Sequence, residues 1–333
     1  MTTLLTALLA GLLVPLGACV GGGSTKTPAD HATSPAPSPL LRVEATVDVP
    51  AAGNVLSTGD RLWVISGGKA ALTQIDPDTN RVTRRVVLPH PVAYGTVAQG
   101  SLWVVSYGEN ALFELDAKSG KVLKRLERSP ALPLDAPVGV AVTGQTVWVL
   151  NHSNSKLLRI DAQTGTLIQT TRMSGDAAAG PFLVGDALWI AMTAQGIVYK
   201  VDPGSGKVVD RPIHVPTGLC AWESVVGHDI WATSRKFADF NCVNGTSRID
   251  TSTGQVDPLT SAEDKSLYTF ARYAGRVWAT DTRQTVYQLN QHTGTLIPAM
   301  TFADRDANHL FSAFGSLWMT RSGNGQLLRL RAT

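Results

Sequence analysis

Two histidines and two carboxylates could do acid–base chemistry, and we expect all four to lie in loops between strands. They form two pairs, His152 with Glu109 and His309 with Asp281. A histidine can move a proton near neutral pH, and a neighbouring carboxylate can orient the imidazole. No H-E-x-x-H, G-x-S-x-G or P-loop motif accompanies them. The alternative interpretation is that each histidine is an ordinary solvated loop residue.

A second set of aromatic and charged side chains could bind a ligand without transforming it. These residues fall in the segments that vary most from one part of the chain to the next, as binding loops do. The ligand-binding candidates are Tyr94, Tyr107, Trp222, Glu223, Arg235, Phe237, Asp239, Arg283 and Arg321.

A repeat centred on tryptophan must position these loops. The repeat recurs every 40 to 47 residues, as RLWVIS at Trp63, SLWVVS at Trp103, TVWVLN at Trp148, ALWIAM at Trp189, DIWATS at Trp231, RVWATD at Trp278 and SLWMTR at Trp318. That spacing is the length of a four-stranded propeller blade. We expect each tryptophan to fill the gap between neighbouring blades; the alternative is a stacking platform for a ligand.

Turns and strand order extend this prediction to the whole ring. Turns of the form D-x-x-[ST]-G, such as DAKSG at Asp116, let Asp start the turn and Gly accept a positive φ. The seventh repeat lacks a fourth strand, whereas residues 42–50 resemble the fourth strand of the first repeat, residues 81–89. We therefore predict an all-β, seven-bladed propeller of four-stranded blades over residues 40–333, with the last blade completed by residues 42–50.

The segment before this domain has the character of an export signal. Residues 1–18 are apolar and uncharged, and Leu16-Gly17-Ala18-Cys19 resembles the bacterial lipobox. We expect a lipid on Cys19 and a flexible Gly/Ser/Pro-rich tether over residues 19–39. An ordinary secretory signal with an incidental cysteine is the alternative. The expected protein is extracytoplasmic and is held to a bacterial membrane through the lipid alone.

Charge and cysteine content restrict the partners. The net charge of +3, without a run of basic residues, gives no basis for nucleic-acid binding. Cys220 and Cys242 form an even pair that we expect to be a disulfide in an oxidising compartment, with two free thiols as the alternative. Two cysteines without clustered histidines give too few ligands for a metal site. A disulfide would pin the loop that carries Arg235 and Phe237.

The third repeat carries a resemblance to known propellers. Its sequence, PVGVAVTGQTVWVLNHSNSKLLRIDAQTGTLI, resembles the YVTN-type repeat, and the LWV or LWI phase is similar to the repeat of virginiamycin B lyase. The lyase resemblance implies a histidine base, with carboxylates holding Mg²⁺ near the mouth of a central channel. His152 with Glu109, or His309 with Asp281, could take those parts.

A third resemblance concerns a cofactor. The D-x-x-[ST]-G turns are similar to the tryptophan-docking repeat of PQQ-dependent quinoproteins, in which a tryptophan follows the glycine by four residues. Lys124, Gln169 and Asp210 occupy those positions here. We therefore expect no PQQ.

Two functions of different classes remain open. The first is a membrane-tethered binding or scaffold module that needs no cofactor and engages a protein, peptide or glycan through its top-face loops. The second is a Mg²⁺-assisted lyase or hydrolase at the mouth of the channel. The second function requires a histidine and two carboxylates to converge on one point.

Overall fold

The structure is a computed structural model and describes residues 40–67, 69–175, 178–216, 219, 223–234, 245–259, 267–281, 285–304, 306 and 309–333. Pro39–Thr333 is one compact unit. The expected signal segment, Cys19 and the tether lie outside the described residues, and so do Cys220 and Cys242. Helices capable of crossing a bilayer do not occur in the described part of the chain.

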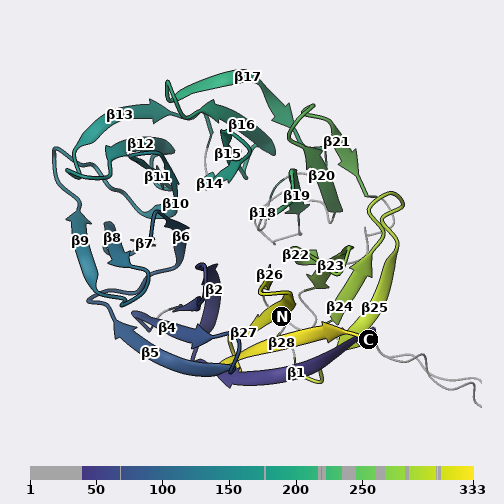
Figure 1. Cartoon of the computed structure of the whole chain (residues 1–333). Helices are drawn as coiled ribbons and strands as arrows, with labels where there is room; N and C mark the ends of the chain where they lie inside the picture. The colour runs from purple at the N-terminus through teal and green to yellow at the C-terminus, as the bar shows by residue number, and fades with distance from the viewer. Residues whose placement is uncertain are drawn as a thin grey trace, which may run out of the picture. The chain divides into compact units, whose positions relative to one another are not determined.

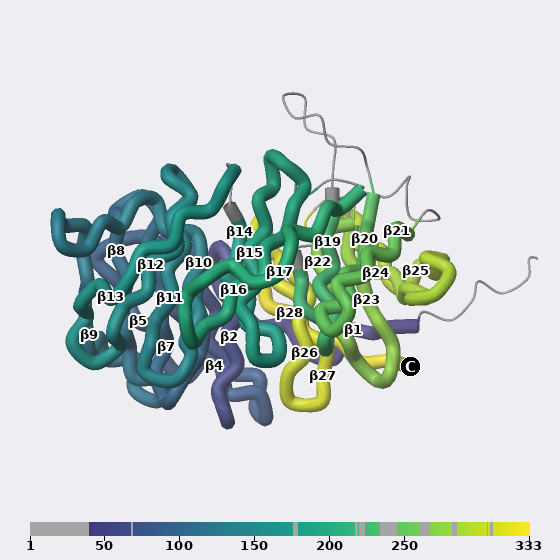
Figure 2. Tube along the Cα trace, turned by 90° about the horizontal axis from the view of Figure 1, so that it is seen from above, coloured from purple at the N-terminus to yellow at the C-terminus, as the bar shows by residue number. Residues whose placement is uncertain are grey.

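Seven antiparallel four-stranded sheets form a ring of blades (Figure 1), which Figure 2 shows edge-on. Blades 1 and 2 contain β2 (Ala52–Ser57), β3 (Leu62–Ser66), β4 (Ala71–Asp76), β5 (Arg81–Val87), β6 (Tyr94–Ala98), β7 (Ser101–Ser106), β8 (Ala111–Asp116) and β9 (Val122–Glu127). Blades 3 and 4 contain β10 (Pro137–Thr143), β11 (Thr146–Asn151), β12 (Lys156–Asp161), β13 (Leu167–Arg172), β14 (Ala178–Val184), β15 (Ala187–Met192), β16 (Ile197–Asp202) and β17 (Lys207–His214). Blades 5 and 6 contain β18 (Glu223–Val226), β19 (Asp229–Ser234), β20 (Gly245–Asp250), β21 (Val256–Pro258), β22 (Leu267–Tyr273), β23 (Arg276–Asp281), β24 (Thr285–Leu289) and β25 (Leu296–Thr301). Blade 7 contains β26 (Leu310–Ala313), β27 (Ser316–Arg321), β28 (Gln326–Ala332) and β1 (Leu41–Asp48).

Strand order defines two faces of the ring. The first strand of each blade lies innermost and the fourth lies at the periphery (Figure 1). We call upper the face where the fourth strand of one blade leads to the first strand of the next. Because neighbouring strands are antiparallel, the loops between second and third strands reach the same upper face. The turns between first and second strands, and between third and fourth strands, lie on the lower face.

The predicted closure of the ring is confirmed. β1 pairs antiparallel with β28, from Leu41 opposite Ala332 to Asp48 opposite Gln326. The strand spans Leu41–Asp48, whereas the prediction extended it to residue 50. The difference arises at Pro50, which lacks an N–H donor and sits in the turn that leads to β2.

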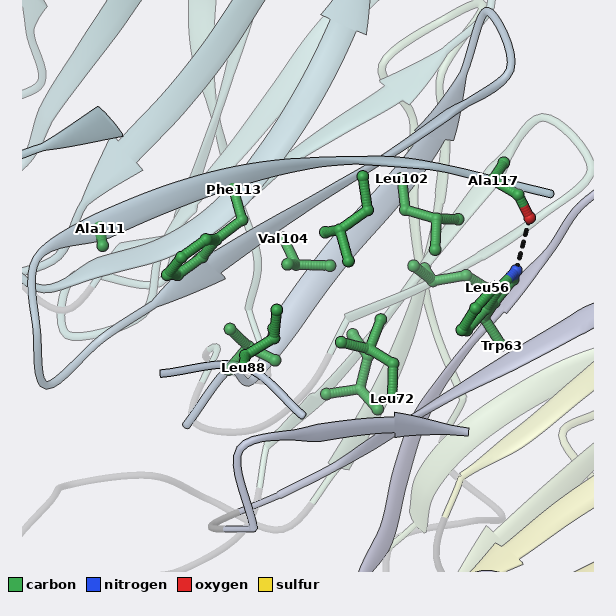
Figure 3. Packing of buried hydrophobic residues seen from close by; sticks show 12 residues of the cluster. Leu56, Trp63, Leu72, Leu88, Leu102, Val104, Ala111, Phe113 and Ala117 are labelled. Atoms are coloured by element: carbon green, nitrogen blue, oxygen red, sulfur yellow. Dashed lines mark hydrogen bonds between the residues drawn. The ribbon is translucent and has the colours of Figure 1, made fainter. Parts of the chain in front are cut away.

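Each repeated tryptophan is buried in an apolar cluster between two blades, so its structural interpretation is confirmed. All seven are between 0% and 3% exposed. Trp63 of blade 1 packs against Leu102 and Phe113 of blade 2, and its Nε1 donates to the Ala117 carbonyl at 2.8 Å (Figure 3). The last cluster joins Trp318 of blade 7 to Leu62 of blade 1. Burial of a tryptophan contributes on the order of 5 kcal/mol as an upper bound.

The D-x-x-[ST]-G turns also form as predicted. Asp116 Oδ1 accepts the backbone N–H of Ser119 at 2.7 Å, and Gly120 adopts a φ of 68°. Hydrogen bonds from the Ser119 hydroxyl and N–H hold the pKa of Asp116 below its usual value. Asp161 repeats the arrangement, because the N–H and hydroxyl of Thr164 hold its pKa low as well.

A polar latch between blades accompanies the tryptophan clusters, and sequence analysis did not predict it. A side chain opposite the tryptophan, on the third strand, donates to a backbone carbonyl in the lower turn of the next blade. Gln74 Nε2 reaches the Lys118 carbonyl at 3.0 Å, and Arg159 Nη1 reaches the Gly204 carbonyl at 2.9 Å. Arg329 Nη1 closes the ring by donating to the Pro77 carbonyl of blade 1 at 2.8 Å.

Candidate functional site

The first strands of the seven blades enclose a central channel with a volume of about 870 Å³. Its wall is largely apolar and includes Phe182, Phe270 and Phe311. Glycine permits the close approach of β10 and β14, because a Cβ on Gly139 would lie 1.8 Å from the carbonyl oxygen of Gly180. The volume lies within the range of about 300–1,000 Å³ that is usual for ligand sites.

Polar side chains gather where this channel opens on the upper face. Tyr94 begins β6, His152 and Thr193 follow the second strands of blades 3 and 4, and His309 precedes β26. All four line the channel. Three of them, Tyr94, His152 and His309, are residues that the sequence singled out, and the ring brings them to one mouth from blades 2, 3 and 7.

Two tyrosine–imidazole pairs flank this upper mouth. The ring centroids of Tyr107 and His152 lie 5.9 Å apart at an angle of 56°, and those of Tyr268 and His309 lie 5.2 Å apart at 48°. Such tilted arrangements are favourable for aromatic rings. Tyr107 is 48% exposed, so one face of this pair is open to a partner.

Burial sets the protonation state of His309. It lowers the pKa of the imidazole to about 4, because a charged ring would lose its hydration there. The side chain is therefore neutral at pH 7, and a neutral imidazole has one donor and one acceptor nitrogen. The backbone N–H of His309 donates to Thr320 Oγ1 at 3.2 Å, which fixes the entry of the chain into β26.

Glu109, the expected partner of His152, is bound to another histidine. Its Oε2 lies 3.6 Å from Nδ1 of His90, and Arg125 Nη2 contacts Nε2 of the same ring at 3.1 Å. The Glu109 side chain is 50% exposed and is not among the described residues that line the channel. This carboxylate holds the loop before β6 against the turn after β7.

Asp281, the expected partner of His309, is 3% exposed and serves the interior of blade 6. It accepts the hydroxyl of Tyr287 at 2.8 Å and the N–H of Thr285 at 2.8 Å. These bonds tie the end of β23 to β24. Within the described ranges, no group of three His, Cys, Asp or Glu side chains is placed to hold a metal ion.

Arg321 has a role in the fold of blade 7. Its guanidinium pairs with Asp304, donates to the Asp306 carbonyl at 3.3 Å and lies 4.7 Å from the ring centroid of Phe302. The residue is 8% exposed. Arg321 thereby holds Asp304 and Asp306 against the end of β27, and Asn324 from the turn that follows β27 also binds Asp304.

The remaining candidates fall in segments that the structure does not describe. Glu223 opens β18, but its side chain is outside the described set. The other predicted residues outside the described ranges are Trp222, Arg235, Phe237, Asp239, Arg283 and the cysteines Cys220 and Cys242. Their proposed roles in ligand binding and in a disulfide stay predictions.

The channel wall also contains residues that sequence analysis missed. Thr193, Phe182 and Phe270 line it, and so does Phe311. The sequence contained a signal for the phenylalanines, because each of them lies on the first, innermost strand of its blade. Reading the first strands for inward-facing residues would have found them, since alternate side chains of a strand share a face.

A scan of protein families matches this chain to a BamB family model. The family model described as "PQQ_2: Outer membrane protein assembly factor BamB" matches residues 32–256, more than half of the chain. The chain belongs to this family. No curated protein sequence matches the chain.

Solved structures share the fold of this BamB-family chain. Virginiamycin B lyase from Staphylococcus aureus superposes with a TM-score of 0.71 at 15% identity, over 88% of this chain and 100% of the lyase. BamB from Moraxella catarrhalis gives 0.58 at 14% identity, over 87% and 97%. Hydrazine synthase from Kuenenia stuttgartiensis gives 0.68 at 17% identity, again over 87% and 97%. Identities this low establish the propeller fold alone.

The residues of this BamB-family chain do not fit the PQQ that the family model's label mentions. Lys124, Gln169 and Asp210 stand where quinoproteins dock the cofactor with tryptophan. Lys124, on the outer strand β9, instead donates to the Gln163 carbonyl at 2.9 Å in the lower turn of blade 3. Gln169 lies against the corresponding turn of blade 4, 3.5 Å from the Gly206 carbonyl.

Proposed function

We propose that this protein is an extracytoplasmic, lipid-tethered propeller that acts as a binding or scaffold module through its upper face. The observation that carries the proposal is the arrangement of the upper mouth. Tyrosine and imidazole rings are presented to solvent and to the channel there, whereas the candidate acid–base carboxylates Glu109 and Asp281 are engaged by His90 and by Tyr287. Concave sites with aromatic walls and a few polar groups favour binding.

The family supports a protein partner. The family takes its name from BamB, an outer membrane protein assembly factor. The lipobox-like sequence before Cys19 supports a position outside the cytoplasm, on a membrane. Exposed tyrosine is enriched at protein interfaces, because a rigid amphipathic ring contributes large contact area at a small loss of entropy.

The alternative function is a metal-assisted lyase or hydrolase. The fold likeness to virginiamycin B lyase and the presence of His152 and His309 in the channel favour it. The lyase would need carboxylates other than Glu109 and Asp281, or a rearrangement of both. Mg²⁺-dependent turnover that is abolished by His152→Ala would support the enzyme and refute the pure binding module.

Site-directed photo-crosslinking in the full, membrane-bound chain tests the binding function. A photoreactive phenylalanine analogue replaces Tyr107 or Tyr268 on the upper face. Ile168 and Ile297, which are 52% and 46% exposed on the outer strands β13 and β25, serve as matched control positions. A protein adduct from an upper-face position, absent at both control positions, is the expected result. Equal adducts from all four positions would refute an upper-face binding site.

Mass spectrometry of the mature N-terminus tests the tether. The expected product begins at Cys19 and carries acyl chains. A mature protein that begins elsewhere and lacks the lipid would contradict the tether and leave the propeller as a freely secreted domain.

A further inference from the structure

Three upper-face segments of blades 2 and 3 form one continuous surface, which we call the blade 2–3 platform. It comprises the turn Tyr107–Asn110, the loop 128–136 and the turn 152–154. The backbone N–H of Arg128 donates to the Asn110 carbonyl at 3.1 Å. The N–H of His152 donates to the Ala136 carbonyl at 3.0 Å. Each turn is therefore tied directly to the loop between them.

Asparagine side chains lock the middle loop. Asn110 Oδ1 accepts the N–H of Ala136 at 2.6 Å. Asn151, which is fully buried, accepts the N–H of Asp135 at 3.0 Å and donates to the Pro133 carbonyl at 2.8 Å. Asn154 Nδ2 donates to Asp135 Oδ2 at 3.0 Å. Three side chains, one from each turn and one from the end of β11, thus fix the path of one loop.

Apolar burial holds the same loop from below. Leu132 is 7% exposed and Leu134 is fully buried, and both belong to the cluster around Trp103 and Val149 between blades 2 and 3. A loop held by both hydrogen bonds and core contacts loses little further freedom when a partner binds. Such preorganisation raises affinity, because less entropy is lost on association.

The platform presents two side chains of the kinds that dominate binding energies. Tyr107 is 48% exposed, and its ring packs against the imidazole of His152. The Arg128 side chain is 59% exposed, and it shares one N–H with Asp135 at 3.2 Å. Tyrosine and arginine are enriched among the residues that contribute most at protein interfaces. Here both project from a surface that is already rigid.

We propose that the blade 2–3 platform binds a polypeptide segment that carries an aromatic side chain beside an acidic one. The aromatic ring packs against Tyr107 and His152 at the channel mouth, and the carboxylate pairs with Arg128. Asp135 occupies one N–H of the Arg128 guanidinium, and its other donors suit a second carboxylate, which a neutral glycan lacks; the charge pattern therefore favours a peptide. The proposal rests on the binding function above and assigns it a surface and a partner chemistry.

Peptide selection on the intact protein tests the assignment. The full chain, solubilised in detergent, is panned with a phage-displayed library of random dodecapeptides, and an enriched peptide is titrated by fluorescence anisotropy. We expect enriched sequences with an aromatic residue beside Asp or Glu. Tyr107→Ala and Arg128→Ala should each weaken binding by roughly 10- to 30-fold. Ile168→Ala and Arg211→Ala, at exposed positions of outer strands, should stay within about twofold.

A positioning variant separates the platform from a chance contact. Asn151 is buried and offers no atom to a ligand, yet Asn151→Ala should weaken the same peptide because loop 128–136 is no longer held. Its thermal unfolding, measured in parallel, ensures that the protein is folded at the assay temperature. Arg128→Lys should recover part of the affinity lost in Arg128→Ala, because it restores the charge but not the planar fork.

Four outcomes would overturn the platform. The first is an enriched peptide whose affinity survives both Tyr107→Ala and Arg128→Ala. The second is enrichment of sequences that lack the aromatic–acidic pair. The third is saturable binding of chitotetraose that Tyr107→Ala abolishes while no peptide is enriched. A partner that crosslinks from Tyr268 and not from Tyr107 would retain the upper-face binding function and refute this surface.

Discussion

Arg329 joins the two ends of the ring, and the effect of removing its side chain can be worked out from its contacts. Nη1 donates to the Pro77 carbonyl of blade 1 at 2.8 Å, and Nε donates to Ser316 Oγ at 2.8 Å and lies 3.3 Å from Glu44 Oε2. The guanidinium also lies 5.4 Å from the ring centroid of Trp318. The side chain is 19% exposed, so water can hydrate part of the space and some of the acceptor groups that Arg329→Ala would leave without a donor.

These contacts give a magnitude. A hydrogen bond to a charged group is worth about 1.5–3 kcal/mol, and the lower end applies at this partly wet rim. Loss of the cation–π contact adds about 1 kcal/mol. Two such hydrogen bonds and the cation–π contact add up to about 4 kcal/mol, which we expect Arg329→Ala to remove from the free energy of unfolding. For a domain of this size that corresponds to a fall in melting temperature of about 6 °C.

Thermal unfolding followed by circular dichroism, with urea midpoints in parallel, measures this effect. Arg331→Ala is the matched control, because the Arg331 side chain is 56% exposed and binds the same Glu44 carboxylate as Arg329, at 2.9 Å, in a pair that solvent keeps weak. Its melting temperature should stay within about 1 °C of wild type. Arg159→Ala, which removes an equivalent latch between blades 3 and 4, should resemble Arg329→Ala. An Arg329→Ala protein that melts with the Arg331→Ala control would refute the latch.

Three further predictions concern pH and packing. Hydrogen bonds hold the folded pKa of Asp161 below its unfolded value, so this contribution is lost as pH falls below about 4, and Asp161→Asn should show a smaller decline in urea midpoint over that range. The folded pKa of His309, about 4, lies below its unfolded value of 6.5, so the unfolded state binds more protons and stability falls from pH 6.5 toward 4. His309→Gln should flatten that part of the profile, and an unchanged profile would exclude a buried neutral imidazole. Gly139→Ala places a Cβ 1.8 Å from the Gly180 carbonyl and should cost about 3 kcal/mol or more in urea unfolding, whereas Gly59→Ala, with nothing within 4 Å, should stay within about 0.5 kcal/mol of wild type.

The blades could be predicted because the same tryptophan packing recurs between all seven pairs of neighbouring blades. A tryptophan between two sheets needs the same neighbours in every repeat, so its spacing exposes the period. The turn at Asp116 is equally local, since donor and acceptor lie three residues apart. The end of β1 was placed two residues too far, because the sequence of residues 42–50 does not show where Pro50 turns toward β2.

The candidate site was predictable only in part. Tyr94, His152 and His309 could be placed at the channel mouth because topology alone carries the ends of first and second strands there. The carboxylates could not be placed. Glu109 contacts His90 and does not line the channel. This contact depends on how the loop before β6 packs against the turn after β7, which the sequence does not show. Asp281 likewise accepts the hydroxyl of Tyr287, a partner that its position at the end of β23 does not reveal.

Because β1 and β28 pair in the last blade, the ring can close only at the end of synthesis. β1 is synthesised before every other described strand, and its partner β28 is synthesised after all of them. During translation and export β1 therefore has no place to pair. The entropy of joining such distant segments grows only slowly with their separation, but contacts this remote in sequence form late and slowly. A nascent or truncated chain therefore exposes the unpaired edges of β1 and blade 7, and the ring closes only after β28 has been synthesised. Until then, chaperones can bind these edges and proteases can cleave the chain.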